Sequence, residues 1–321
     1  VTRPIFGWWT RKMAVQPVVR KAELLRGGCT EEEANFLNGR SLMALASGIS
    51  HGYGCVLFPE GTSHNNAYML RFRTGPMRTV LAASALAKAS DRELPVLIPM
   101  GLHFRTREYF RTDVWVEYGE PIQVESNEVP QNLVDAVSSG TWSEPPAESV
   151  FRLRDKLREE LVPLSPNAHT WDEYRALLLL GHINGRVNNN QPKTWREEVK
   201  QARHFRDKYS TKPETLDVDN LQPEKISHPL IAKSEKAAEI LHRNGLDGRD
   251  LNATSTRLSS PKMTKPPFAT ARLGLFIALL PVFLISLLPQ VILGRLLGDS
   301  TDEGIDARSS YQFLAAMFGS I

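Results

Sequence analysis

The sequence predicts an α/β fold in which a mixed, mostly parallel sheet is flanked by helices. A helical pattern over 31–48 leads to an apolar run at 55–58, and a second helical pattern, 76–86, leads to an apolar run at 95–101. Residues 112–118 then alternate apolar and polar side chains. Strands that alternate with helices build largely parallel or mixed sheets. A helical appendage and a C-terminal hydrophobic membrane segment follow this domain in the predicted fold.

The predicted elements begin or end at residues with clear local signals. Gly52 and Gly54 separate the first helix from the first strand, because glycine interrupts regular structure. Pro76 suits the first turn of the second helix, where its missing amide proton has no partner to lose. The alternating strand ends at Gly119 and Pro121.

Six residues at the end of the first predicted strand form the strongest functional signal in the chain. They place a carboxylate, a glycine and two hydroxyls where an apolar run stops: Phe58, Pro59, Glu60, Gly61, Thr62 and Ser63. In open α/β sheets ligands bind at strand ends. Glu60 can accept a hydrogen bond from a ligand hydroxyl, and Gly61 lets a ligand approach the backbone. The alternative is that Glu60 caps a turn of ordinary turn-forming residues.

Three side chains just past this hexapeptide are further candidates. Arg71 and Arg73 follow the polar turn and can pair with phosphate oxygens, or they are surface charges. His64 titrates near neutral pH and can serve as a base, or it is a solvated turn residue. The sequence alone leaves both alternatives open.

Composition and charge narrow the class of protein. The net charge of +3 over 321 residues and the long apolar run near the C-terminus argue against nucleic acid as a partner. Cys29 and Cys55 provide neither a disulfide framework nor a set of metal ligands, so no metal site is predicted. The basic, aromatic stretch at 1–26 suits an anionic lipid surface or a phosphorylated substrate. Its alternative is a solvated basic face.

The sequence from 145 to 255 has helical periodicity and many charged residues. Two pairs there match the spacing of a capping box, which satisfies free amides at a helix start: Thr170 with Glu173, and Thr194 with Glu197. We predict a helical appendage over 145–255 and a linker, rich in serine, lysine and proline, over 256–268.

The segment 272–298 is predicted to lie in a membrane. Residues 273–293 contain no charge, which is enough length for a helix to cross a bilayer. Pro281 and Pro289 either kink one spanning helix or divide a re-entrant hairpin, and a buried core helix is the alternative. Cations before the run and acids after it predict that the large N-terminal part lies on the cytoplasmic side.

Ordered segments of the chain resemble the conserved blocks of the glycerolipid acyltransferase superfamily, which contains glycerol-3-phosphate and lysophosphatidate acyltransferases. Residues 58–63 resemble the third block, and 96–101 resemble the fourth. Residues 7–20 resemble the second block, and 118–122 are similar to the segment that commonly ends the domain. The resemblance covers 1–125 and implies an acyltransferase α/β domain there.

The resemblance also implies roles for individual residues. Arg20, which closes the second block, and Glu60 correspond to residues that bind the glycerol phosphate in the family. Pro99 and Gly101 lie in the fourth block, and we expect them to form the wall of the acyl pocket. These roles concern binding and positioning, not bond making.

No catalytic residue is assigned. In the family the catalytic histidine and aspartate, separated by four residues, lie upstream of the second block, and nothing before Arg20 has this spacing. His242 and Asp247 have it, but they follow the other blocks, so we interpret their spacing as coincidence. Because the chain begins with Val1 and not Met, we expect a truncation upstream of the catalytic pair. The alternative is a relative that has lost activity.

The sequence therefore predicts an acyltransferase of phospholipid biosynthesis at a membrane. Its donor is acyl-CoA or acyl carrier protein, and its acceptor is glycerol 3-phosphate, dihydroxyacetone phosphate or a lysophospholipid. The alternative is a catalytically inactive, membrane-bound relative that binds glycerophosphate or has a regulatory role. The expected partners are the phosphorylated acceptor, acyl-CoA and membrane lipids, with no bound cofactor and no nucleic acid. The sequence does not predict an oligomeric state.

Overall fold

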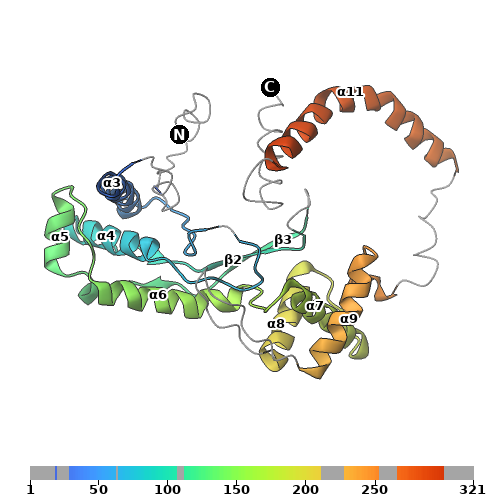
Figure 1. Ribbon diagram of the computed structural model, residues 1–321, viewed down its shortest axis with the longest axis horizontal. Coiled ribbons are helices and arrows are strands. Elements are labelled where there is room, and N and C mark those ends of the chain that lie inside the picture. The colour runs from blue at the N-terminus through green and yellow to red at the C-terminus, as the bar shows by residue number, and fades with distance from the viewer. Residues whose placement is uncertain are drawn as a thin grey trace. The chain divides into compact units, whose positions relative to one another are not determined.

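The computed structural model (Figure 1) describes residue 19 and the ranges 29–62, 64–106, 112–210, 228–252 and 266–299. The chain divides into two compact units. Unit 1 consists of the described residues up to Thr62, Leu70–Gly101 and Tyr118–Leu164, and unit 2 of those in Ser63–Met69, Leu102–Glu117 and Ser165–Ile321. Neither unit is one continuous stretch of sequence.

Helices α3 and α4 form the framework of unit 1. Helix α3, Glu31–Ser50, begins with a capping box in which the side chains of Thr30 and Glu33 each accept a bond from the other's backbone amide. Helix α4, Gly75–Ala89, carries a proline in its first turn, as predicted. It is buried over most of its length and packs against α3 and α5, Gln131–Ser138.

Helix α6, Ala147–Leu161, completes unit 1 and contacts α4. Its buried side chains follow helical spacing and form one apolar stripe: Val150, Leu153, Leu157 and Leu161. The opposite face of α6 is charged and exposed, which leaves arginines of this helix available to neighbouring loops.

Strand structure in the described part of the chain is limited to four short segments in two pairs. Strand β1, Val96–Leu97, pairs antiparallel with β4, Ile122–Gln123, so that Val96 lies opposite Gln123. Strand β2, Met100–Phe104, pairs with β3, Val114–Tyr118, in a second antiparallel pair. The strands predicted near 95–101 and 112–118 therefore exist, although the first is split in two.

The predicted mixed, mostly parallel sheet is wrong. None of the strand pairs among the described residues is parallel, and residues 55–58 form no strand. The side chains of Val56 and Phe58 are 65% and 70% exposed. A four-residue apolar run is compatible with a buried strand, but a strand forms only where a neighbouring segment supplies backbone partners. The helices predominate because their hydrogen bonds lie within each segment.

In unit 2, helix α7 packs against both α8 and α9 (Figure 1). They span Trp171–Val187, Trp195–Tyr209 and Pro229–Arg243, and α7 contacts both of the others. Their small apolar core is contributed by all three helices and by two preceding segments: Ala67, Ala168, Tyr174, Leu177, Ala202 and Ile231. The boundaries predicted for the appendage, 145 and 255, stay predictions.

The helix starts predicted from capping boxes are correct, with one difference in detail. The hydroxyls of Thr170 and Thr194 accept bonds from the amides of Glu173 and Glu197, at 3.1 and 3.3 Å. Each glutamate carboxylate, however, accepts from the amide of the residue before the threonine. The same donor-rich helix end is satisfied, one position further upstream.

Helix α11, Pro266–Asp299, contains the predicted membrane segment 272–298. It bends along its length (Figure 1), and Pro281, which has no amide proton, lies in its interior. In the part of the chain that the structure describes, no helix is long and apolar enough to cross a bilayer. The membrane segment of the predicted fold is therefore wrong, because the length of a charge-free run does not by itself make a helix apolar enough to span a bilayer. Most of the predicted linker, 256–268, lies outside the described residues.

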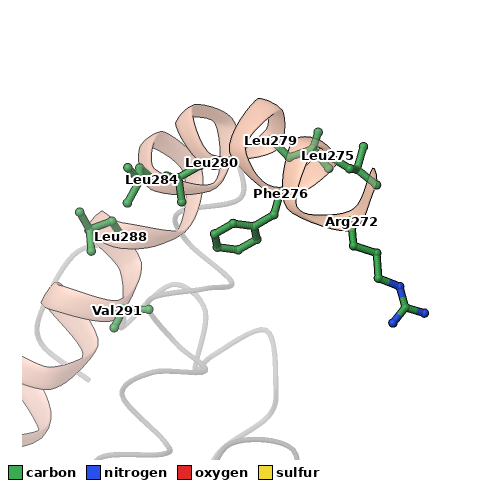
Figure 2. A pocket seen from close by; sticks show the side chains of 8 residues that line it. All are labelled: Arg272, Leu275, Phe276, Leu279, Leu280, Leu284, Leu288 and Val291. Atoms are coloured by element: carbon green, nitrogen blue, oxygen red, sulfur yellow. The ribbon is translucent and has the colours of Figure 1, made fainter. Parts of the chain in front are cut away.

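Side chains of this helix line an apolar groove of about 520 Å³ (Figure 2). Leu275, Phe276 and Leu284 line it, and Arg272 lies at one end. None of the predicted site residues contributes to the groove. Its lining comes from a single helix, so the groove by itself does not define a ligand.

Candidate functional site

Residues 58–61 form a tight turn of unit 1 and not the end of a strand. The Gly61 amide donates to the Phe58 carbonyl oxygen at 3.2 Å. Gly61 has a φ of +67°, a backbone region that favours glycine. A Cβ atom added there would lie 3.1 Å from Cγ of Arg73. The turn thus requires glycine both for its backbone conformation and for the approach of a neighbouring side chain.

Glu60 holds this turn against the segment 70–73. Its Oε2 accepts a hydrogen bond from the Leu70 amide at 2.7 Å. The Arg73 amide donates to the Pro59 carbonyl oxygen, also at 2.7 Å. The half-exposed carboxylate is therefore held in place by the backbone and needs no ligand to order it.

Helix α6 supplies a cation here that sequence reasoning missed. The Nη1 of Arg158 donates to the Leu70 carbonyl oxygen at 3.3 Å, and its guanidinium lies 5.5 Å from the centre of the Phe72 ring. Burial lowers the pKa of Arg158, and the Glu60 carboxylate opposes this shift, so the two charges interact. Arg158 and Leu70 are 88 positions apart, so no local signal in the sequence relates them.

Pro59 is buried, whereas four other predicted residues of this region lie at the surface. Phe58, Thr62, Arg71 and Arg73 are exposed. The backbone of Arg73 is bonded to the turn at Pro59, and its side chain begins beside Gly61. The arrangement offers a carboxylate for a hydroxyl group and guanidinium groups for a phosphate.

Two predicted site residues, Arg20 and Ser63, lie outside the described residues. Pro99 and Gly101 are buried, and the Pro99 carbonyl oxygen accepts a bond from the Gly119 amide at 2.9 Å. A Cβ atom at Gly119 would lie 3.3 Å from the Pro99 ring. Pro99 therefore packs in the interior of unit 1, and its role in an acyl pocket stays a prediction.

The histidines considered as catalytic candidates have other surroundings. The Nδ1 of His64 accepts a bond from the Asn66 amide at 3.1 Å, which places the ring within its own turn. His242 is exposed in the last turn of α9, while Arg249 binds the Asp247 carboxylate at 2.9 to 3.0 Å. The described residues contain no group of three or more His, Cys, Asp or Glu side chains that can hold a metal ion.

Unit 2 contains a buried ion cluster that the sequence did not reveal. One part is Glu117, whose Oε1 accepts from Nη1 of Arg203 at 2.9 Å and whose Oε2 lies 3.1 Å from Nε2 of His103. The other part is Glu198, which accepts two bonds from the Arg105 guanidinium at 2.7 and 2.8 Å. The carboxylates lie on β3 and α8, so the cluster joins the strand pair to the helices of unit 2.

The pKa values in this cluster follow from burial and pairing. Burial pushes the pKa of Glu117 and of Glu198 upward, but hydrogen bonds and charge from arginine and histidine partners outweigh it, so both pKa values lie below normal. Burial lowers the pKa of His103, although Glu117 opposes this shift. The cluster therefore holds ionised carboxylates and a neutral histidine at neutral pH.

Comparison with known proteins relates the chain to one class of enzyme. No family model and no solved structure matches it. Glycerol-3-phosphate O-acyltransferase 2 of Saccharomyces cerevisiae is 30% identical to it over 151 residues. This similarity supports the resemblance to the glycerolipid acyltransferase superfamily found in the sequence. The match covers 47% of the chain and 19% of the relative, so only a part of that acyltransferase is represented here.

Proposed function

We propose that the chain is part of an acyltransferase of phospholipid biosynthesis and that the turn at 58–61 positions the acceptor. The donor is acyl-CoA or acyl carrier protein, and the acceptor is glycerol 3-phosphate, dihydroxyacetone phosphate or a lysophospholipid. The observation that carries this proposal is the backbone-held carboxylate of Glu60, which interacts with Arg158, in a turn to which the backbone of Arg73 is bonded. The chain is also similar to a glycerol-3-phosphate acyltransferase. The relative's name favours glycerol 3-phosphate among the acceptors.

The reaction explains why such a turn is useful. An acceptor hydroxyl oxygen attacks the thioester carbonyl and gives its proton to a base as the new C–O bond forms. The C–S bond then breaks, and the thiolate leaves and takes up the proton. Glu60 would accept a hydrogen bond from one glycerol hydroxyl, because a carboxylate oxygen that already binds the Leu70 amide still has acceptor capacity. The guanidinium groups of Arg73 and Arg158 would hold the phosphate. We assign no catalytic base.

Replacement of Glu60 by glutamine tests this role in the protein that carries the chain. Glutamine keeps an oxygen for the Leu70 amide, so the turn stays formed while the carboxylate charge is lost. We expect the KM for glycerol 3-phosphate to rise roughly threefold to tenfold with little change in kcat. Glu120→Gln, at an exposed position of the same unit, is the control and should leave both constants unchanged.

An unchanged KM in Glu60→Gln would contradict the proposed role. Binding without turnover would have a different meaning. If calorimetry detects glycerol 3-phosphate binding that depends on Glu60 and no acyl transfer occurs, the protein is the glycerophosphate-binding relative. Its location at a membrane, with this domain on the cytoplasmic side, stays a prediction of the sequence.

A further inference from the structure

A second cavity, of about 610 Å³, lies entirely within unit 2. It is bounded by the facing ends of β2 and β3, by the start of α8 and by η3, Gly248–Asn252. The side chains that give it its character are Arg105, Trp115, Lys193, Trp195, Arg196 and Arg249. None of the residues predicted to bind the acceptor lines this cavity. Its volume is in the range typical of small-molecule sites.

The lining has an excess of positive charge. Four cations face two carboxylates, Asp113 and Glu198, and Arg105 binds both of these. Arg249 is paired with Asp247 outside the lining. Within the described residues, Lys193 and Arg196 form no ion pair, and both are exposed. Two cations at the mouth of the cavity are therefore left for an anion from solution.

Aromatic surface accompanies these charges. The guanidinium of Arg196 lies 5.7 Å from the centre of the half-buried Trp115 ring, whose other neighbour is the stacked imidazole of His103 at 4.8 Å. Arg105 lies 4.5 Å from the centre of the Trp195 ring. Layers of indole and guanidinium are the surfaces on which nucleic acid bases stack. A cavity with both features suits a ligand that joins an aromatic base to phosphates.

The start of α8 adds little to this argument. Thr194 and Glu197 already satisfy amides at that helix end, and Glu197 and Glu198 place negative charge in its first turn. The cations of the lining, and not the helix terminus, would therefore provide the attraction. These cations can be replaced without disturbing the start of α8.

We propose that this cavity binds the nucleotide end of coenzyme A, with Lys193 and Arg196 pairing with its phosphates. The cavity's charge and aromatic surface select a phosphorylated nucleotide. The choice of coenzyme A among nucleotides rests on the acyl-transfer function proposed above. Arg105 and Glu198 form the wall and hold each other, so they position the cavity and do not release their charges to the ligand.

Equilibrium binding to the whole chain tests the proposal. Coenzyme A, adenosine 3′,5′-bisphosphate, adenosine and inorganic phosphate are titrated separately, with heat and tryptophan fluorescence as readouts. We expect coenzyme A and the bisphosphate to bind with similar affinity, and adenosine and phosphate to bind at least tenfold more weakly. The affinity for coenzyme A should also fall as salt rises, because charge pairs are screened.

The double variant Lys193→Ala/Arg196→Ala should bind coenzyme A at least tenfold more weakly. The control Lys200→Ala/Lys236→Ala removes two positive charges from exposed positions of α8 and α9 and should change affinity less than twofold. Equal losses in the two double variants would overturn the proposal, because long-range charge alone would then explain binding. It would also be overturned if the unaltered chain bound no coenzyme A at millimolar concentration, or bound phosphate as tightly.

The two proposals fail in distinguishable ways. Coenzyme A binding needs no turnover, and Glu60→Gln should leave it unchanged. Conversely, glycerol 3-phosphate binding should persist in Lys193→Ala/Arg196→Ala. If coenzyme A does not bind but Glu60→Gln still raises the KM for glycerol 3-phosphate, only the nucleotide site is disproved. If coenzyme A binds as expected but Glu60→Gln leaves the KM for glycerol 3-phosphate unchanged, only the acceptor site is disproved.

Discussion

The turn of unit 1 and the ion cluster of unit 2 both set carboxylates beside arginines, but they differ in how far water reaches those charges. Glu60 is half-exposed and bonds a backbone amide. The side chain of Glu198 is 6% exposed and bonds the Arg105 guanidinium twice. A half-exposed carboxylate can bind a ligand while it keeps its amide. A buried one cannot change partners without leaving an unpaired charge in the interior.

This difference shows that a shifted pKa is an incomplete guide to function in this protein. Strongly perturbed groups gather at active sites in many enzymes, but structural ion pairs perturb pKa values equally. Here the lowered pKa values of Glu117 and Glu198 arise from internal partners. The residues best placed to meet a ligand are the half-exposed Glu60 and the two lining cations that form no ion pair within the described part of the chain, Lys193 and Arg196.

The largest expected effect is on the free energy of unfolding when the buried ion cluster of unit 2 is disrupted. Glu198→Ala leaves the Arg105 guanidinium without its main partner, so the free energy of unfolding should fall by about 3 to 5 kcal/mol. Glu239→Ala breaks an exposed pair with Arg243 one helical turn away and should lower it by no more than about 0.5 kcal/mol. Urea denaturation of both variants measures the difference. Equal losses would mean that Glu198 is not effectively buried.

A smaller effect is expected at the exposed turn. Gly61→Ala forces a side chain into a left-handed backbone conformation, which costs about 1 to 2 kcal/mol. Gly54→Ala, at a glycine with ordinary φ and no atom within 4 Å of the new Cβ, should change stability by about 0.5 kcal/mol or less. Thermal unfolding compares the pair. If alanine is tolerated equally at both positions, the turn at 58–61 does not have the described conformation.

The smallest expected effect concerns pH. Burial lowers the pKa of His103 below its ordinary value of 6.5, so the folded state resists protonation that the unfolded chain accepts. The resulting stability is present above about pH 6.5 and is lost as pH falls toward the folded pKa. The low pKa values of Glu117 and Glu198 act in a separate window, because their contribution is lost only as pH falls below about 4.5.

Histidine variants separate this contribution from others. Unfolding measured between pH 7 and pH 5 should show a decline in stability that His103→Gln reduces. His204→Gln, at an exposed position of α8, should leave the decline unchanged. If stability still falls by the full amount between pH 7 and pH 5 in both variants, His103 is not the group that titrates. Water would then reach the buried cluster more than its geometry indicates.

The elements that local signals predict are the ones that formed. Pro76 marks the first turn of α4, and Thr170 and Thr194 cap α7 and α8, because each of these features acts within one helical turn. The parallel sheet failed for the opposite reason. Whether residues 55–58 form a strand depends on a partner segment elsewhere in the chain, and no pattern within four residues specifies one.

The sequence by itself determined the helix starts and the hexapeptide that resembles a conserved block of the glycerolipid acyltransferases, because these depend on the chemistry of adjacent residues. The positive φ that makes glycine necessary at position 61 was visible only in the structure. Only the tertiary structure decided that Arg158 joins Glu60 at Leu70 and that Lys193 and Arg196 share a cavity with Trp115. These groups are brought together by packing between elements distant in the chain, and packing depends on every residue of the fold at once.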